Sequence, residues 1–299
     1  MVAGTNDATD PTGNNAAHGF THDEIVLVGN YATSSDYEIE FDRTVPSRIA
    51  IPKSFYSFRR DFNDWWNGAP TVLNQQDFNE AFTVNRLVRV LMKDGRHYFD
   101  TFGNTPINFQ AGPSPVIITL NNSVPNECDL DHGLVAPLSF MRYWVRNAAG
   151  PEAERFTGTT GPIGQLLRTE VLPGNKTTPM NITGTPTPNQ RVVLDYVVSF
   201  NLDFVMTAGT SEGSPDNYVA GVPVASGAQT AVMANPERVR AIRVTLATRT
   251  PEQNENFPWD AGLCANLGCF QVFSDRPGAA RVRSARAEIF LPNLAAEGF

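Results

Sequence analysis

The chain has 299 residues, of which 41% are hydrophobic, and its formal net charge is −8. The acidic balance argues against a nucleic-acid partner, because phosphate binding needs a basic surface. A membrane-spanning helix needs about 20 consecutive apolar residues, and the sequence contains no such run. The chain is long enough for one large domain or two small ones.

Short apolar runs separated by frequent Gly and Pro favour a β-rich fold. In the first half, strands are predicted at residues 24–29, 37–41, 48–52, 84–93, 96–101 and 115–120. Asp94-Gly95 is a hairpin turn between the fourth and fifth of these strands. Residues 1–22 are polar and rich in turn formers, and we interpret them as a flexible lead-in.

A helix is predicted from Ser54 to about Asn67, with Ser54 as N-cap and Gly68 ending it. A second short helix is predicted at residues 75–82. Large aromatic residues recur at helical spacing in the first helix: Phe55, Phe58, Phe62, Trp65 and Trp66. Such a cluster is more often core than surface, but Phe55, Phe62, Trp65 and Trp66 are kept as candidate partner-facing aromatics.

The second half contains longer β segments. Residues 134–146 and 165–172 are predicted to pair as an antiparallel hairpin, and residues 238–249 and 281–291 as another with a long connection. Between them lies Arg191–Met206, in which every second residue from Val192 is apolar. This period of two is typical of a strand with one buried face. Because strands usually have about 5–6 residues, we expect this one to bend or to enter a turn.

No motif for nucleophilic, phosphate-binding or zinc chemistry occurs, so we predict neither catalytic residues, nor a cofactor, nor a metal, and we do not expect an enzyme. His18 and His22 lie in the polar lead-in and are predicted to be exposed. Asp129, Asp131 and His132 form a small acidic loop that could hold calcium. The full set of EF-hand ligands is missing, so a polar turn is favoured.

Three cysteines occur, at positions 128, 264 and 269. Cys264 and Cys269 are close in sequence and lack the second cysteine pair that a zinc ribbon needs. We interpret them as a disulfide-closed loop in an oxidising compartment. The alternative is three unpaired thiols in a cytosolic protein.

Pro236–Thr250 and Ala280–Asn293, two arginine-rich strand segments, resemble the C-terminal end of PilW-type minor pilins of type IV pili. These are related to the J-type minor pseudopilins of type II secretion. Asp23–Gly29 resembles the family's first strand after the N-terminal helix. The resemblance implies an α+β, mainly β fold: a single pilin-like antiparallel sheet over residues 23–299, with long insertions around 53–82 and 207–234.

One departure from the family concerns the N-terminal hydrophobic helix. Gly19–Glu24 mimics the Gly-Phe-Thr-Leu-x-Glu signature of pilins, but only Ile25–Val28 follows it before Gly29. That run is far too short to cross a membrane. We therefore expect the genuine helix to precede Met1 and to be absent from the chain.

The resemblance implies a structural subunit of a priming or tip complex that supports pilus assembly, twitching motility and cell adhesion. Its partners would be other minor pilins, a PilY1-type tip adhesin and the major pilin, with membrane contact only through the missing helix. The protein would lie in the inner membrane and periplasm before assembly, and in the extracellular, cell-surface pilus afterwards. The alternative is a secreted β-rich carbohydrate-binding module, in which Trp65, Trp66, Trp144 and Trp259 would stack on sugar rings.

Overall fold

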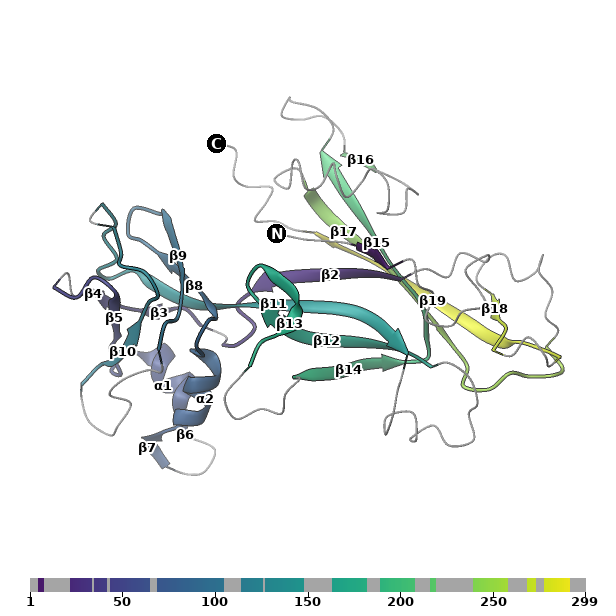
Figure 1. The fold of residues 1–299 in the computed structure, drawn as a ribbon, viewed down its shortest axis with the longest axis horizontal. Coiled ribbons are helices and arrows are strands. Elements are labelled where there is room, and N and C mark those ends of the chain that lie inside the picture. The colour runs from purple at the N-terminus through teal and green to yellow at the C-terminus, as the bar shows by residue number, and fades with distance from the viewer. Residues whose placement is uncertain are drawn as a thin grey trace. The chain divides into compact units, whose positions relative to one another are not determined.

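The computed structural model of the chain is mainly β, with two short helices (Figure 1). It describes residues 5–7, 22–33, 35–41, 44–64, 69–104, 114–125, 127–147, 163–181, 189–207, 216–218, 239–257, 268–272 and 277–290. The strands form a large mixed, mostly antiparallel sheet, a three-stranded sheet and a two-stranded one. No described helix is long and apolar enough to cross a membrane. The predicted α+β, mainly β fold class is confirmed.

The chain divides into two compact units. Unit 1 comprises residues 1–26, 142–168 and 191–299, and unit 2 comprises residues 27–141 and 169–190. Each has its own buried apolar cluster: one runs from Tyr37 to Val135 in unit 2, and another joins Val198 to Ala280 in unit 1. Separate cores of this kind are what define separate compact units.

Unit 2 contains both helices, α1 (Tyr56–Phe62) and α2 (Gln75–Ala81). Its strands are β3 (Tyr37–Glu38), β4 (Glu40–Phe41), β5 (Arg48–Ile51), β6 (Asn63–Asp64), β7 (Ala69–Leu73), β8 (Leu87–Leu91), β9 (His97–Thr101), β10 (Val116–Thr119) and β13 (Asn175–Pro179). The predicted hairpin is confirmed: β8 and β9 pair antiparallel across a turn in which Gly95 has φ 85°. The first helix ends at Phe62, earlier than predicted, because residues 63 and 64 pair with β7.

Aromatic rings form the centre of the unit 2 core. Phe78 stacks on Phe82 with ring centroids 4.5 Å apart, and Phe62 meets Phe78 edge-on at 4.9 Å. Phe58 is completely buried beside them. The helical spacing of Phe58 and Phe62 thus serves to aim both rings from one face of α1 into the core.

A buried ion pair fastens α2 to β12 (Gly164–Leu172), in the part of that strand that belongs to unit 2. The Arg86 guanidinium donates to both carboxylate oxygens of Glu170, at 2.8 and 2.7 Å. Its third nitrogen donates to the backbone carbonyls of Glu80 and Ala81 at the end of α2. Arg86 therefore satisfies carbonyls that the helix itself leaves unpaired.

Unit 1 contains most of the long strands. They are β1 (Thr5–Asp7), β2 (His22–Gly29, in part), β11 (Leu134–Asn147, in part), β14 (Gln190–Asp195, from Arg191 on), β15 (Val197–Thr207), β16 (Asp216–Tyr218), β17 (Val239–Arg249), β18 (Cys269–Phe270) and β19 (Ala280–Phe290). β17 pairs antiparallel with β15 on one side and with β19 on the other. The predicted pairing of the two arginine-rich strands is confirmed. β1 and the first residue of β2 lie within the predicted lead-in and pair with each other, Asp7 opposite His22.

The predicted strand Arg191–Met206 is interrupted at Tyr196. This residue has φ 60°, an uncommon conformation for an aromatic residue, and it separates β14 from β15. The Tyr196 carbonyl accepts a hydrogen bond from the backbone amide of Arg249 at 3.0 Å, and the Arg249 guanidinium lies 5.4 Å from the Tyr196 ring centroid. Contacts distant in sequence therefore hold the bend in place.

Replacing Glu170 with Ala should destabilise unit 2 strongly, because the Arg86 side chain, only 2% exposed, would lose its counterion. Leaving a buried charge unpaired typically costs about 3–5 kcal/mol. The free energy of unfolding in urea measures the loss. Arg96→Ala is the control, because the Arg96–Asp94 pair is 60% and 49% exposed and should contribute little to stability. Equal losses in the two variants would contradict the assigned role of the buried pair.

Candidate functional site

One face of the three-stranded group β15, β17 and β19 is continuously apolar. The register places Phe200 opposite Leu246, Leu202 opposite Val244 and Phe204 opposite Ile242. On the other side of β17 it places Leu246 opposite Ala285, Val244 opposite Ala287 and Ile242 opposite Ile289. Directly opposed residues share a face of a sheet. These nine side chains are called the apolar face below.

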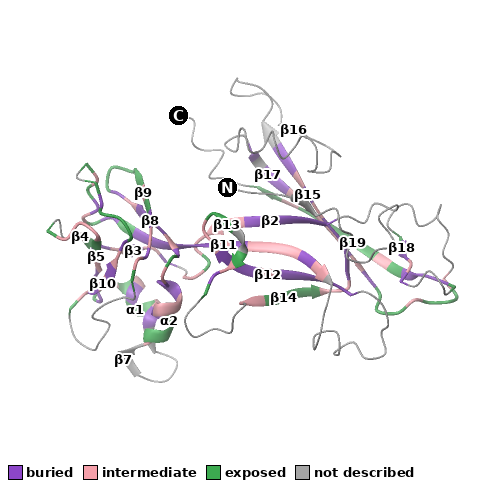
Figure 2. Ribbon diagram, viewed as in Figure 1, coloured by how far each residue is buried: buried purple, intermediate pink, exposed green. Residues whose placement is uncertain are grey.

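Burial of the apolar face falls from one strand to the next. In β15, Phe200, Leu202 and Phe204 are all at most 5% exposed. In β17, Val244 and Leu246 are half-buried, and in β19, Ala285 and Ala287 are exposed and Ile289 is 51% exposed. Figure 2 shows the contrast between the mostly exposed β19 and the buried β2. The apolar face is thus covered at one side and open at the other.

The opposite face of the same strands is polar in its middle. Asn201, Thr245 and Arg286 form one row across the three strands, and Asp203, Arg243 and Glu288 form the next. Arg243 donates to Glu288 at 3.1 Å. Toward one end this face is covered instead, where Phe270 and Val272 pack with Val198 and Ala247. The group is therefore amphipathic, with open apolar surface on one face and an ionic row on the other.

Charged residues of β2 are buried beside β15. His22, Asp23 and Glu24 are 2%, 6% and 5% exposed, so the prediction that His22 is exposed was wrong. The reason is that β2 pairs with β15 in parallel at Phe200 and His22, and so lies inside the sheet. Asp23 accepts a hydrogen bond from the backbone amide of Leu202 at 2.8 Å.

Glu24 has a charged partner on β11. Arg142 Nε donates to Glu24 Oε2 at 2.9 Å, and the side chains are 18% and 7% exposed. The same guanidinium lies 4.5 Å from the ring centroid of Trp144. Glu24 is therefore compensated by an arginine, whereas Asp23 is held by a backbone amide.

The environment of Asp23 shifts its titration toward neutral pH. Burial raises its pKa, the hydrogen bond from Leu202 lowers it, and the nearby charge of Asp203 raises it further. The net effect is a pKa raised to about 6 from the ordinary 3.8. Folding consequently favours the neutral form of the Asp23 carboxyl. This group lies beside β15, the first strand of the apolar face.

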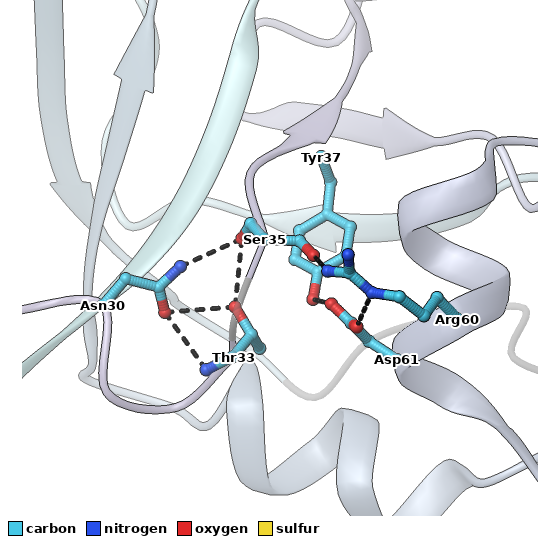
Figure 3. A network of polar contacts seen from close by, with 6 residues as sticks. All are labelled: Asn30, Thr33, Ser35, Tyr37, Arg60 and Asp61. Atoms are coloured by element: carbon cyan, nitrogen blue, oxygen red, sulfur yellow. Dashed lines mark hydrogen bonds and ion pairs between the residues drawn. The ribbon is translucent and has the colours of Figure 1, made fainter.

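A second polar cluster lies in unit 2 (Figure 3). Asp61 accepts hydrogen bonds from the Tyr37 hydroxyl at 2.7 Å and from Arg60 Nε at 2.9 Å. Arg60 also donates to the Ser35 hydroxyl, and the carbonyl of Ser35 accepts from Asn30 Nδ2 at 2.9 Å. Burial alone would raise the pKa of Asp61, but hydrogen bonds from Arg60, Ser35 and Tyr37 outweigh it and lower the pKa. The cluster ties α1 to β3 and to the loop that precedes β3, which is a structural role.

The predicted partner-facing aromatics do not form an exposed patch among the described residues. Phe62 is 2% exposed and belongs to the unit 2 core, which corrects its assignment as partner-facing. Phe55 is half-buried. Trp65 and Trp66 lie outside the described residues. The helical spacing that suggested a surface patch is the spacing that a core face requires.

The cysteines differ in state. Cys269 takes part in a disulfide, while Cys128 is a half-buried free thiol. Cys264 lies outside the described residues, so its pairing with Cys269 stays a prediction.

The acidic loop at residues 129–132 is a hydrogen-bonded turn. Asp131 accepts from the Phe41 amide and Asp129 from the Asp131 amide, both at 3.3 Å. His132 Nδ1 lies 3.2 Å from Glu38 Oε1. In the described part of the chain, no group of three or more His, Cys, Asp or Glu residues is placed to hold a metal ion. The carboxylates of Asp129 and Asp131 accept hydrogen bonds from backbone amides, which is the arrangement expected of a polar turn.

Comparison with known proteins gives no family model, no curated relative and no solved structure that matches the chain. The function must therefore be inferred from the geometry. The apolar face is the strongest candidate interaction site in the described residues, because exposed apolar surface gathered in one place usually marks a binding surface. Sequence periodicity predicted the apolar row of β15, but could not show that β19 would be left uncovered.

Replacing Asp23 with Asn should remove one source of the pH dependence of the protein's stability. Because the folded pKa of Asp23 is about 6 and its ordinary value 3.8, its stabilising contribution is complete below pH ~4 and is lost as the pH rises through ~6. Between pH 5 and 8 the free energy of unfolding of the natural protein should fall by about 1–1.5 kcal/mol relative to that of Asp23→Asn. Urea unfolding at both pH values measures the difference. Parallel pH profiles would contradict the shifted pKa.

Proposed function

We propose that this chain is the globular part of a PilW-type minor pilin, a structural subunit of a type IV pilus rather than an enzyme. The observation that carries the proposal is the apolar face, which is buried at β15 and open at β19. The segments that resemble the pilin family contain β17 and β19, the two strands on which this face becomes accessible. The two strands that carry the resemblance to the family, β17 and β19, are thus also the strands whose apolar side chains remain accessible.

The dimensions of the open surface suit a single helix. Neighbouring strands lie about 4.8 Å apart, so β17 and β19 together present a strip about 10 Å wide. An α-helix with its side chains is about 10–12 Å across. In the pilin family this cover would be the C-terminal half of the N-terminal helix, whose other half joins the filament core. The apolar face would then hold the helix that anchors the subunit.

The remaining features fit a subunit exposed outside the cytoplasm. The disulfide at Cys269 is favoured by an oxidising compartment. The acidic charge of −8 suits contacts with proteins better than direct contact with DNA. The proposed partners are other minor pilins, the major pilin and a PilY1-type tip adhesin. The proposed location is the inner membrane and periplasm before assembly and the cell-surface pilus afterwards.

The carbohydrate-binding alternative gains no support from the described residues. Of its four candidate tryptophans, Trp65, Trp66 and Trp259 lie outside the described residues. Trp144 is half-buried, and the Arg142 guanidinium already lies 4.5 Å from its ring centroid. A ring covered by arginine on one face is poorly placed to stack on sugar.

The variant Ala287→Asp tests the proposal. It is introduced into the natural gene and expressed in a strain of the source organism that lacks the natural copy. Ala287 is exposed on the apolar face of β19, so the change should leave folding within about 0.5 kcal/mol. A charge beneath the docked helix should still prevent the subunit from entering pili. Immunoblots of sheared pili, together with twitching assays, measure the loss.

Ser284→Asp is the matched control, because Ser284 is exposed on the same strand but opposite Ala247, on the other face. It should assemble normally. Absence of the natural protein from sheared pili, with normal piliation in the deletion strain, would refute the pilin proposal. Equal behaviour of the two aspartate variants would instead refute only the role of the apolar face.

A further inference from the structure

β14 is an unusually apolar edge strand. Val192, Val193 and Leu194 are 37%, 52% and 36% exposed. Successive residues of a strand point to opposite faces, so apolar side chains are accessible on both sides of β14. Among the described strands, β14 pairs only with β12, so no described strand pairs with its second edge.

The break at Tyr196 creates this surface. Without it, Val192 and Leu194 would continue the row of Phe200 and Leu202, which is buried in β15. Instead the chain turns at Tyr196, where φ is 60°, and these residues leave the core. Natural edge strands are usually protected by a charge, a proline or a bulge. Residues Val192, Val193 and Leu194 of β14 supply none of these.

The sequence of β14 is complementary to itself in the antiparallel direction. If two copies pair about a two-fold axis at Val193, each Val192 faces Leu194 of the second copy. Arg191 then faces Asp195 of the second copy, and Asp195 faces Arg191. The charges therefore match at both ends of the apolar centre. Asp195 already accepts a hydrogen bond from Gln165 at 2.8 Å, and a carboxylate has room for a further donor.

We propose that β14 is a homodimerisation edge, which pairs antiparallel with β14 of a second copy of this chain. The contact is isologous, so it closes after two copies and does not propagate into a fibre. Backbone hydrogen bonds supply the attachment, and the alternating side chains supply the register. A parallel arrangement would place Arg191 beside Arg191 and Asp195 beside Asp195, which like-charge repulsion disfavours.

The expected dimer is weak. Stable interfaces bury about 800 Å² on each partner, and a six-residue strand supplies only part of that area. Association should therefore depend on concentration and become important where copies are held close together. The inference does not depend on the pilin proposal, because it uses neither β17 nor β19.

Cysteine cross-linking tests the register, in a Cys128→Ser background that removes the free thiol. In Val193→Cys the two new thiols would face each other across the axis, with Cα atoms about 4.5–5.5 Å apart, within disulfide range. In Val192→Cys, the matched control, they would be diagonal neighbours about 7–8 Å apart, beyond that range. Under mild oxidation, non-reducing gels should show at least tenfold more dimer for Val193→Cys. Equal cross-linking, or none in either variant, would overturn the proposal.

Sedimentation velocity provides an independent measurement that needs no cysteine. The natural chain should show a weight-average sedimentation coefficient that rises with concentration. Val193→Lys should abolish this rise, because two lysines would meet on the axis, whereas Val193→Thr, which keeps a β-branched residue, should retain it. A natural chain that stays monomeric at every concentration, or a Val193→Lys variant that associates normally, would refute pairing through β14.

Discussion

The continuous pairing of β15, β17 and β19 is the constraint on which the organisation of unit 1 depends. Nine opposed residue pairs join β17 to β19 without a register shift, and a similar ladder with two shifts joins β17 to β15. A slip of one residue would exchange the apolar face with the ionic row of Arg243 and Glu288. The side chains therefore specify the register, and the register in turn places Ala285, Ala287 and Ile289 on one face and Arg286 and Glu288 on the other.

The buried charges of β2 depend on the same arrangement. Asp23 can lie inside the sheet because the Leu202 amide donates to it, and Glu24 because Arg142 neutralises it. Neither partner is near in sequence. Polar residues at the start of a strand normally indicate solvent, and only the placement of β2 beside β15 reverses that expectation. The result is a strand whose stability responds to pH next to the surface that is proposed to bind a helix.

Local patterns predicted what depends on neighbours in sequence. Alternation identified β15, β17 and β19, Asp94-Gly95 identified the β8–β9 turn, and helical spacing identified Phe58 and Phe62. Features set by distant contacts could not be predicted: the bend at Tyr196, which Arg249 holds, the burial of His22, and the division into two units. Periodicity shows which residues share a face, but not which strand ends at an edge. The sequence therefore could not predict that the apolar face would be left uncovered at β19.

The two exposed apolar surfaces of unit 1 differ in the kind of partner each can accept. On β19 the exposed side chains of Ala285, Ala287 and Ile289 belong to one face of a paired ladder. A face is covered by packing, which a helix does well. On β14 both faces are accessible and one backbone edge is unpaired among the described strands. An unpaired edge needs hydrogen bonds as well as packing, and a strand supplies both. The two surfaces therefore do not compete for the same partner, and a subunit could hold its helix on one while pairing through the other.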